Sequence, residues 1–514
     1  MKKCTTEGRP DRRWLPSGVL IALALVGAGV LLNRDTPQIP GIPAPVRIES
    51  TSWRAGVEVE LTVHTTPPRA GELVTLTLLA PGTDQPQPAE VEGDRANSFF
   101  GLSGVQLLWL SPEHREIEVA LAAATGASTI GLDFDWRRIE PEPGQHVWAD
   151  TDDVVALAKR YGLHLVPMLL YTPRWASTAP FAPLDYQRAP PADLNAYRDF
   201  VYAVVSRYKP YGISPLTSDG FGITDWVMWN EPNVSTHRRA PQPGDFWAGS
   251  LEEYLGLLRA GYEGAHAADP GCNVLNGALA DVFWKENELD LITAMERFYD
   301  PDGNGDPADG GRPFFDTLNI HTYQVGEPDA AWYEERLERV LRVMERFGDE
   351  QKSIWITETG YGSLHAPGSP HSSADETSEK ISYVNEETQA SAVHLVYETC
   401  SVYAQVERVF WWSLRDYYTD ASATNTAMEA HYGLLRANFA PKPAYLAYAR
   451  LTGSVDQVLT LTVVTDADGI VHVTIPSSFV THQGTYIVFA ALDETVQSGV
   501  ASYNILPGAG KGQD

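Results

Sequence analysis

The sequence TDDVVALAKRYGLHLVPMLLY, residues 151–171, joins an amphipathic segment (151–162) to a short apolar run (163–171). A second apolar run, TIGLDFDW (129–136), precedes it, so this stretch has the order strand, helix, strand. Short apolar runs that alternate with longer amphipathic segments are typical of parallel strands joined by crossover helices. The stretch therefore predicts an α/β fold built on a parallel sheet.

The same alternation extends on both sides of this stretch, over residues 98–453. The strand candidates are GVQLLWL (104–110), TIGLDFDW (129–136), LHLVPMLLY (163–171), DWVMWN (225–230), NVLNGAL (273–279), TLNIHTY (317–323), SIWITE (353–358) and RVFWWSL (408–414). The clearest helices cover 151–162, 251–270, 330–348 and 442–453. Eight strands with crossover helices predict a closed (β/α)₈ TIM barrel. A doubly wound open sheet is the competing fold, but no glycine-rich phosphate loop follows the first strand.

Segments with period-two alternation flank the barrel on both sides. They are VEVELTVHT (57–65), LVTLTLLAP (73–81), VLTLTVVT (458–465), GIVHVTI (469–475) and TYIVFAAL (485–492). Such alternation predicts half-buried antiparallel strands. We expect an N-terminal β-rich segment (47–97), the barrel (98–453) and a C-terminal β-rich segment (454–507). Whether the two β-rich segments join in one sandwich is left open by the sequence.

The N-terminal residues have the pattern of a targeting signal. Five basic residues precede the apolar run WLPSGVLIALALVGAGVLL (14–32). A helix of these 19 residues would nearly cross a hydrocarbon core of about 30 Å. Because positive charge stays on the cytoplasmic side, we predict a signal anchor over 1–33, with a cleaved signal peptide as the alternative. A Pro-rich linker (34–46) follows, and the remainder is expected to be extracytoplasmic, either membrane-anchored or secreted.

The composition excludes some partners. The chain has 514 residues, with 67 acidic against 38 basic ones and a formal net charge of −29. Such a charge repels nucleic acids and acidic polymers, whereas a neutral carbohydrate is compatible with it. We expect no nucleic acid partner, and membrane contact only through the N-terminal apolar segment. Cys272 and Cys400 are expected to be buried thiols, and no Cys/His cluster has the spacing of zinc ligands.

Two strand candidates end in a glutamate. The fourth ends in WNEPN (229–233), with Glu231, and the seventh ends in ITETG (356–360), with Glu358. In (β/α)₈ barrels the loops after the strands form the active site. Cleavage of a glycosidic bond uses two carboxyl groups, one to protonate the leaving oxygen and one to meet the charge at the anomeric carbon. An isolated Asn-Glu-Pro is often a capping turn, but the second glutamate three strands later favours a glycoside hydrolase.

These motifs, with the pair Trp411-Trp412 in the eighth strand, resemble glycoside hydrolase clan A over about residues 100–453. The WNEPN form is similar to the β-xylosidase and α-iduronidase family, family 39. ITETG and the segment WRRIEP (136–141) are similar to the cellulase-like family 5. The resemblance implies retention of configuration, with Glu231 as acid/base and Glu358 as nucleophile. It also implies that Asn230 holds the 2-hydroxyl group of the sugar.

Further candidates surround this pair. His321 and Tyr323, in IHTY (320–323), match positions where the clan places groups that hydrogen-bond the nucleophile; a histidine satisfied at the rim is the alternative. Trp175, Trp411 and Trp412 are candidate platforms for sugar stacking. Since alternate strand residues point to opposite faces, only one of the two adjacent tryptophans should face the barrel mouth.

One position departs from the clan pattern. Clan members usually carry an arginine in the second strand that steadies the nucleophile, and alignment on Trp136 places Gly131 there. Arg137 and Arg138 follow the strand and either substitute for it or lie on the surface. Loss of the cation should raise the pKa of Glu358. The alternative function is therefore a catalytically weak, cell-surface carbohydrate-binding barrel; a metal-dependent hydrolase is disfavoured because no His-x-His pair closes the first strand.

The segment DPDGNGD (300–306) resembles the first half of a calcium loop. Its oxygen-bearing side chains alternate around Gly305, and they belong to Asp300, Asp302, Asn304 and Asp306. The glutamate expected at position twelve is replaced by Gly311. We expect no cofactor; a structural calcium ion and an acidic solvated loop are the two interpretations of this segment.

Overall fold

The computed structural model describes residues 46–51, 53–82, 99–104, 107–182, 185–234, 246–281, 290–324, 326–364, 384–416, 431–481, 484–492 and 498–505. All of them belong to one compact unit, 36–514. The predicted signal anchor (1–33) and all but the last residue of the predicted linker lie outside these ranges. Among the described helices, none has the length and apolar composition that a membrane span requires.

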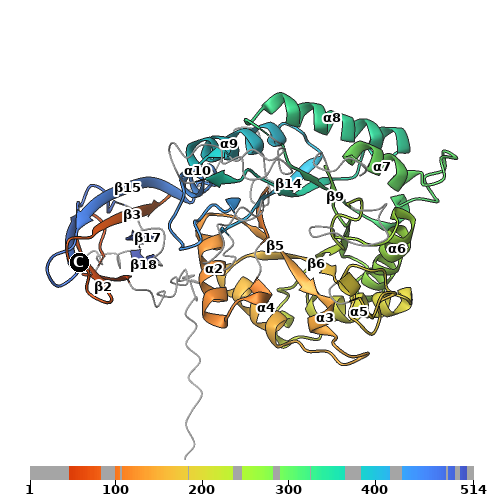
Figure 1. Ribbon diagram of the computed structural model, residues 1–514, viewed down its shortest axis with the longest axis horizontal. Coiled ribbons are helices and arrows are strands. Elements are labelled where there is room, and N and C mark those ends of the chain that lie inside the picture. Colours follow the sequence, from red (N-terminus) through yellow and green to blue (C-terminus); the bar gives the residue numbers. More distant parts are fainter. Residues whose placement is uncertain are drawn as a thin grey trace, which may run out of the picture. The chain divides into compact units, whose positions relative to one another are not determined.

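A parallel sheet wraps into the barrel at the centre of Figure 1. Its order is β8-β7-β6-β5-β4-β14-β11-β10-β9. The strands are β4 (Phe100–Ser103), β5 (Thr129–Asp135), β6 (His164–Leu170), β7 (Asp225–Met228), β8 (Asn273–Asn276), β9 (Leu279–Ala280), β10 (Leu318–Thr322), β11 (Ile354–Thr359) and β14 (Val406–Trp412). β8 and β9 share the fifth position, and a parallel bridge between Leu275 and Thr317 closes the ring. The predicted TIM barrel is confirmed.

Seven of the eight predicted strands are found in place, and the prediction for the first is wrong. The first strand is β4, which ends at Ser103, whereas Leu107–Trp109 form a short 3₁₀ helix, η1. Gly104 ends the strand with a φ of +68°, a conformation that a regular strand does not contain. Leu107 and Leu108 are nevertheless buried in the core. Apolar content therefore predicted their burial correctly and their backbone conformation wrongly.

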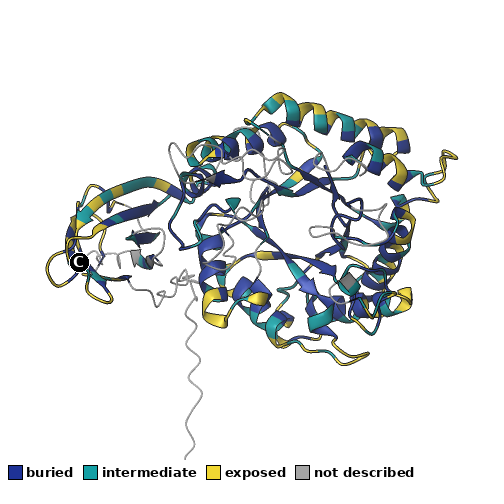
Figure 2. Cartoon of the chain, in the orientation of Figure 1, coloured by how far each residue is buried: buried dark blue, intermediate teal, exposed yellow. Residues whose placement is uncertain are grey.

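Helices surround the sheet, with buried faces toward the strands and exposed faces outward (Figure 2). They are α2 (Pro112–Ala124), α3 (Trp136–Ile139), α4 (Ala149–Tyr161), α5 (Leu194–Tyr208), α6 (Leu251–Ala268), α7 (Leu291–Tyr299), α8 (Ala330–Phe347), α9 (Glu386–Ser401) and α10 (Pro443–Leu451). α6 begins with a capping box between Ser250 and Glu253. α4 and α8 each end at a glycine in the left-handed conformation. The four helices predicted from sequence are confirmed.

The two β-rich segments form common antiparallel sheets. One sheet has the order β1-β2-β16 and the other the order β15-β3-β17-β18. The strands are β1 (Val46–Ser50), β2 (Val59–Thr65), β3 (Leu73–Pro81), β15 (Val455–Val464), β16 (Ile470–Ile475), β17 (Gly484–Ala491) and β18 (Gly499–Ile505). Val63, Leu76, Val473 and Val488, which come from both ends of the chain, share one buried core. The question that the sequence left open is answered: the segments build one β-sandwich.

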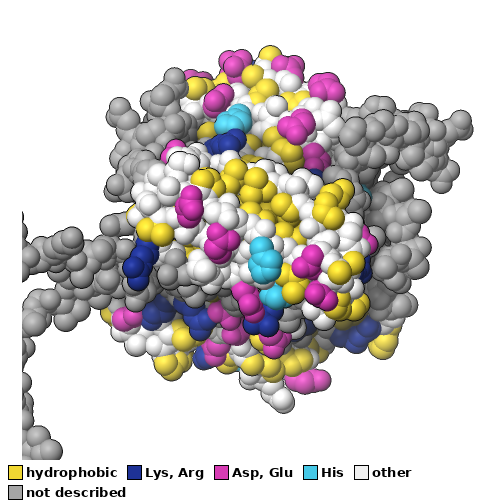
Figure 3. Space-filling view, turned by 90° about the vertical axis from the view of Figure 1, so that its left-hand side faces the viewer, with side chains coloured by type: hydrophobic (Ala, Val, Ile, Leu, Met, Phe, Trp, Pro, Cys, Tyr) yellow, Lys and Arg dark blue, Asp and Glu magenta, His cyan; other side chains and the backbone are white. Residues whose placement is uncertain are grey.

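Two features of the composition also have structural counterparts. Cys272 and Cys400 are free and buried, as predicted. Acidic side chains are spread over the face drawn in Figure 3, in keeping with the net charge of the chain.

Candidate active site

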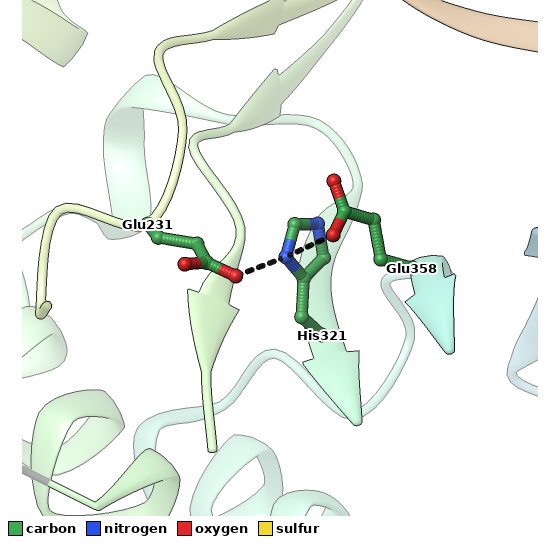
Figure 4. A group of neighbouring side chains, drawn as sticks. All are labelled: Glu231, His321 and Glu358. Atoms are coloured by element: carbon green, nitrogen blue, oxygen red, sulfur yellow. Dashed lines mark hydrogen bonds and ion pairs between the residues drawn. The ribbon is translucent and has the colours of Figure 1, made fainter. Parts of the chain in front are cut away.

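Glu231 and Glu358 meet at the carboxyl ends of the barrel strands, with His321 between them (Figure 4). Glu231 follows β7, His321 belongs to β10 and Glu358 to β11. His321 Nδ1 lies 2.7 Å from Glu231 Oε1 and 3.5 Å from Glu358 Oε2. The three facing atoms lie within 4.8 Å of one another. The barrel thus brings together two carboxylates that are far apart in the sequence.

The loop that carries Glu231 has a strained backbone. Trp229 and Glu231 have φ values of +78° and +39°, which bulky residues rarely adopt. Contacts to other elements hold this conformation: Trp229 Nε1 donates to the Phe246 carbonyl (3.1 Å). Asn233 Nδ2 donates to the Ala280 carbonyl (2.8 Å), and the Ala280 N–H donates back to Asn233 Oδ1 (2.9 Å). Strain of this kind persists where the surroundings over-determine the backbone, and it concentrates at functional sites.

The strand that carries Glu358 is bulged instead. Ile320 pairs with Ile356, but the next residue, His321, pairs with Glu358, so Thr357 is an extra residue in β11. In a regular strand Thr357 and Glu358 would point to opposite faces. Here Thr357 Oγ1 lies 3.0 Å from His321 Nε2 while Glu358 lies near Nδ1 of the same ring. The bulge therefore turns two consecutive side chains toward one histidine.

The surroundings of Glu358 disfavour its charge. The pKa of Glu358 is raised to about 7, chiefly by burial and also by the carboxylates of Glu231 and Asp133. A charged His321 would act in the opposite direction, and Tyr323 does so, because its hydroxyl donates to Glu358 Oε2 (2.8 Å). Among the described residues no arginine is one of the main causes of this shift. A raised pKa of Glu358 is the result expected when Gly131 replaces the arginine of the clan pattern.

The two arginines after β5 pair with other groups. Arg137 Nε donates to Asp135 Oδ1 (2.8 Å), and its guanidinium lies 4.9 Å from the ring centre of Tyr171. Arg138 Nη2 donates to Asp150 Oδ2 (2.6 Å). Both positive charges are thus matched by nearby aspartates, and no bond from either arginine to Glu358 is found among the described residues.

His321 is buried and Tyr323 is half-buried beside the pair. Burial lowers the pKa of His321, which is 0% exposed, so its imidazole is neutral at neutral pH. Burial and the charge of Glu358 raise the pKa of Tyr323 well above its usual value, so its hydroxyl keeps its proton. Both residues were expected to hydrogen-bond Glu358. Tyr323 does so, whereas His321 lies closer to Glu231 than to Glu358.

The adjacent tryptophans separate as the alternation predicts. Trp411 is fully buried. Trp412 is partly exposed and lies edge-on to Tyr323, with 6.4 Å between ring centres. Trp175 packs edge-on against Trp136 (5.6 Å), and its indole N–H donates to the Glu140 carbonyl (3.0 Å). Trp412 is therefore the tryptophan that the described contacts connect to the carboxylate pair.

Asn230 is 5% exposed, and among the described residues its Oδ1 has no hydrogen-bond partner. Such an acceptor, buried next to Glu231, is available to a donor from outside the protein, because leaving it unsatisfied costs about 1–3 kcal/mol.

Sequence reasoning missed two residues. Asp133 lies on β5, on the same face as Gly131, and burial and the charge of Asp135 raise its pKa to about 7. The period of two that starts at Gly131 could have found it. Trp109 is 53% exposed and lies 4.8 Å from the Arg138 guanidinium. The wrong strand over 104–110 placed this residue inside the sheet, although it belongs to the loop after β4.

Among the described residues, one group of side chains has the spacing of metal ligands, and it consists of Glu231, His321 and Glu358. The 2.7 Å contact between His321 and Glu231 is a direct hydrogen bond, and we assign no metal to these side chains. In the predicted calcium loop, Asp302, Asn304 and Asp306 accept hydrogen bonds from backbone N–H groups of the loop. The two interpretations of this segment, a structural calcium site and an acidic solvated loop, both stay open.

Comparison with known proteins gives likenesses among solved structures. No family model matches the chain, and no curated relative matches it. A monomeric β-xylosidase from Caulobacter crescentus is 15% identical, with 80% of this chain and 75% of that chain covered and a TM-score of 0.49. A family 39 glycoside hydrolase from Bacteroides cellulosilyticus is 15% identical (90% and 96% covered, TM-score 0.46). Xylanase 10B from Thermotoga maritima is 17% identical (70% and 96% covered, TM-score 0.44).

All three of these solved structures are glycoside hydrolases. At these identities function does not follow from the likeness. By its own sheet topology, the chain is a (β/α)₈ barrel with a carboxylate pair at the carboxyl ends of its strands.

Proposed function

We propose that the chain is a retaining glycoside hydrolase in which Glu358 is the nucleophile and Glu231 the acid/base. The observation that carries this proposal is the approach of the two carboxylates, whose facing atoms lie within 4.8 Å. Retaining enzymes hold their carboxyl groups about 5–5.5 Å apart, whereas inverting enzymes leave about 6.5–9.5 Å for a water molecule. The spacing supports direct attack by a carboxylate.

The different surroundings of the two groups support the assignment of roles. Glu358 accepts a hydrogen bond from Tyr323, which favours its carboxylate form, and Glu231 faces the imidazole of His321. In the first step Glu358 attacks the anomeric carbon, the glycosidic C–O bond breaks and Glu231 gives its proton to the departing oxygen. In the second step Glu231 takes a proton from water, the water oxygen attacks the anomeric carbon and Glu358 leaves as a carboxylate.

The substrate class follows from charge and from unsatisfied groups. The net charge of −29 favours a neutral poly- or oligosaccharide over an acidic one. The free Asn230 Oδ1 suits a sugar hydroxyl, and Trp412 and Tyr323 offer an aromatic wall beside Glu358. The predicted N-terminal signal would place this activity outside the cytoplasm.

Labelling with 2-deoxy-2-fluoro glycosides that carry good leaving groups tests the nucleophile. Fluorine slows the second step, so the glycosyl-enzyme accumulates and peptide mass spectrometry locates it. We expect the label on Glu358 of the wild type and no label on the Glu358→Gln variant. A label on another residue, or undiminished turnover in Glu358→Ala, contradicts the assignment.

A second candidate is a carbohydrate-binding barrel with weak catalysis. The raised pKa of Glu358, which has no arginine among its main described causes, favours it, because a protonated carboxyl cannot attack. A panel of aryl glycosides, compared with glycan binding by Glu231→Gln, separates the two functions. Turnover that disappears on mutation supports the enzyme, and glycan binding without turnover in the wild type supports the binding protein.

A further inference from the structure

A chain of hydrogen bonds with a fixed direction leads from β8 to the site. Asn319 Nδ2 donates to the backbone carbonyl of Asn276 (3.1 Å). A carbonyl oxygen can only accept, so this bond fixes which side of the Asn319 amide is nitrogen. Asn319 Oδ1 then faces Thr357 Oγ1 (2.6 Å) and must accept the hydroxyl proton of Thr357.

The direction of this chain determines the tautomer of His321. The hydroxyl of Thr357 has one proton, and that proton is directed at Asn319. Toward His321 Nε2, 3.0 Å away, Thr357 can therefore only accept, so Nε2 carries the hydrogen. His321 is fully buried, and burial favours the neutral ring, which has a single N–H.

The remaining nitrogen then faces Glu231. With the hydrogen on Nε2, His321 Nδ1 presents a lone pair to Glu231 Oε1 at 2.7 Å. A lone pair and an ionised carboxylate do not hydrogen-bond, so this short contact requires the proton to be on Glu231. Glu358 lies 3.5 Å from the same nitrogen and takes its hydrogen bond from the Tyr323 hydroxyl instead.

We propose that Asn319 and Thr357 are positioning residues, which hold His321 in the Nε2–H tautomer and thereby keep the proton on Glu231. The bulge in β11 makes this possible, since without the extra residue Thr357 would face away from His321. The relay explains why two neighbouring buried carboxyls take different roles. Its kinetic consequence rests on the proposed function, whereas the tautomer itself does not.

The charged groups that face His321 are Glu231, which follows β7, and Glu358 on β11. Tyr323, which follows β10, and Asp133 of β5 act on Glu358. None of them contacts Nε2, where the described partner is Thr357. The described hydrogen bonds of the Thr357 side chain go to His321 and Asn319, and none goes to a carboxylate.

Nitrogen NMR of the full-length protein with ¹⁵N-labelled histidine tests the tautomer without any substrate. We expect a protonated Nε2 and an unprotonated Nδ1 for His321 at neutral pH, with the signal assigned by its loss in His321→Gln. An Nδ1–H tautomer, or a ring protonated on both nitrogens, overturns the proposal. This measurement needs only the wild type and His321→Gln, so it does not depend on whether the Thr357 variants fold.

Variants of Thr357 test whether its hydroxyl determines the tautomer of His321. In Thr357→Val the acceptor for Nε2–H is gone, so we expect the hydrogen to move to Nδ1, where it is donated to the Glu231 carboxylate. Thr357→Ser should restore the wild-type tautomer. Thr359→Val is the matched control, because Thr359 lies on the same strand and bonds Tyr333 rather than His321. An unchanged tautomer in Thr357→Val, or a changed one in Thr359→Val, contradicts the relay.

The pH profile supplies the kinetic readout. A hydrogen donated from Nδ1 favours the ionised form of Glu231. In Thr357→Val the Glu231 carboxyl should therefore lose its proton at a lower pH than in the wild type. We expect the basic limb of kcat/KM to move down by about one pH unit, a roughly tenfold loss of rate on that limb. An unmoved basic limb in an active Thr357→Val contradicts the relay, whereas absence of wild-type turnover on every glycoside contradicts the proposed function and leaves the NMR result standing.

Discussion

The loop after β7 and the end of β11 present equivalent glutamates by different means. Glu231 is held by a strained backbone with positive φ values at Trp229 and Glu231. Glu358 has a strand conformation, and its direction depends on the extra residue in the ladder with β10. The first arrangement depends on anchors outside the strand, and the second depends on strand register. Loss of the loop anchors should therefore displace Glu231, and a change of strand register should displace Glu358, independently of each other.

Their electrostatic surroundings differ as well. Burial and two neighbouring carboxylates raise the pKa of Glu358, and a tyrosine hydroxyl opposes that shift. Glu231 instead shares a short hydrogen bond with a neutral, buried histidine. When the surroundings of two neighbouring carboxyls give them different pKa values, one can act as the acid/base and the other as the nucleophile.

The largest expected effect is the loss of activity on mutation of the two glutamates, and its dependence on the leaving group distinguishes their roles. Glu358→Ala should lose about 10⁴-fold or more in kcat on any glycoside, because bond formation at the anomeric carbon is removed. Glu231→Gln should lose about 10²–10⁴-fold on substrates with poor leaving groups and far less on dinitrophenyl glycosides, which need no protonation. Steady-state kinetics on both substrate types checks this, and equal losses for both leaving groups in Glu231→Gln would exclude it as the acid.

A smaller effect is expected from the anchor of the β7 loop. Asn233→Ala removes both hydrogen bonds to Ala280 and releases the strained loop, so kcat/KM should fall by about 10–100-fold. The free energy of unfolding should fall by about 1–3 kcal/mol, measured by denaturant titration. Asn195→Ala, at an exposed asparagine in α5, is the matched control. Full activity in a destabilised Asn233→Ala would show that the loop needs no such anchor.

The smallest effect concerns the surroundings of Glu358. Gly131→Arg adds a cation in the barrel interior, where a Cβ would lie 3.4 Å from that of Ser103. An opposite charge nearby favours the carboxylate, so the pKa of Glu358 should fall from about 7 by about 1–3 units. Since the nucleophile must be ionised, the acidic limb of kcat/KM should move to lower pH by the same amount. Gly131→Met controls for volume, and an equal shift in that variant would rule out a charge effect.

Part of this site could be predicted from the sequence. Period-two and helical alternation predicted seven barrel strands and four helices, because burial follows local periodicity. The Asn-Glu-Pro motif and the glutamate in ITETG predicted which carboxyls lie at the strand ends. Alternation also predicted that one of Trp411 and Trp412 is core. The first strand was predicted wrongly, since an apolar run is equally compatible with a buried turn.

The tertiary structure alone decided the rest. Which tryptophan faces Tyr323, how the two β-rich segments pair and how Asp133 acts on Glu358 all depend on residues that meet across strands. The bulge at Thr357 leaves no mark in composition, because it is defined by pairing between β10 and β11. The sequence by itself determined the barrel and its two glutamates through local patterns. The register of the strands and the protonation of the glutamates depend on contacts between residues far apart in the sequence, so only the folded chain determines them.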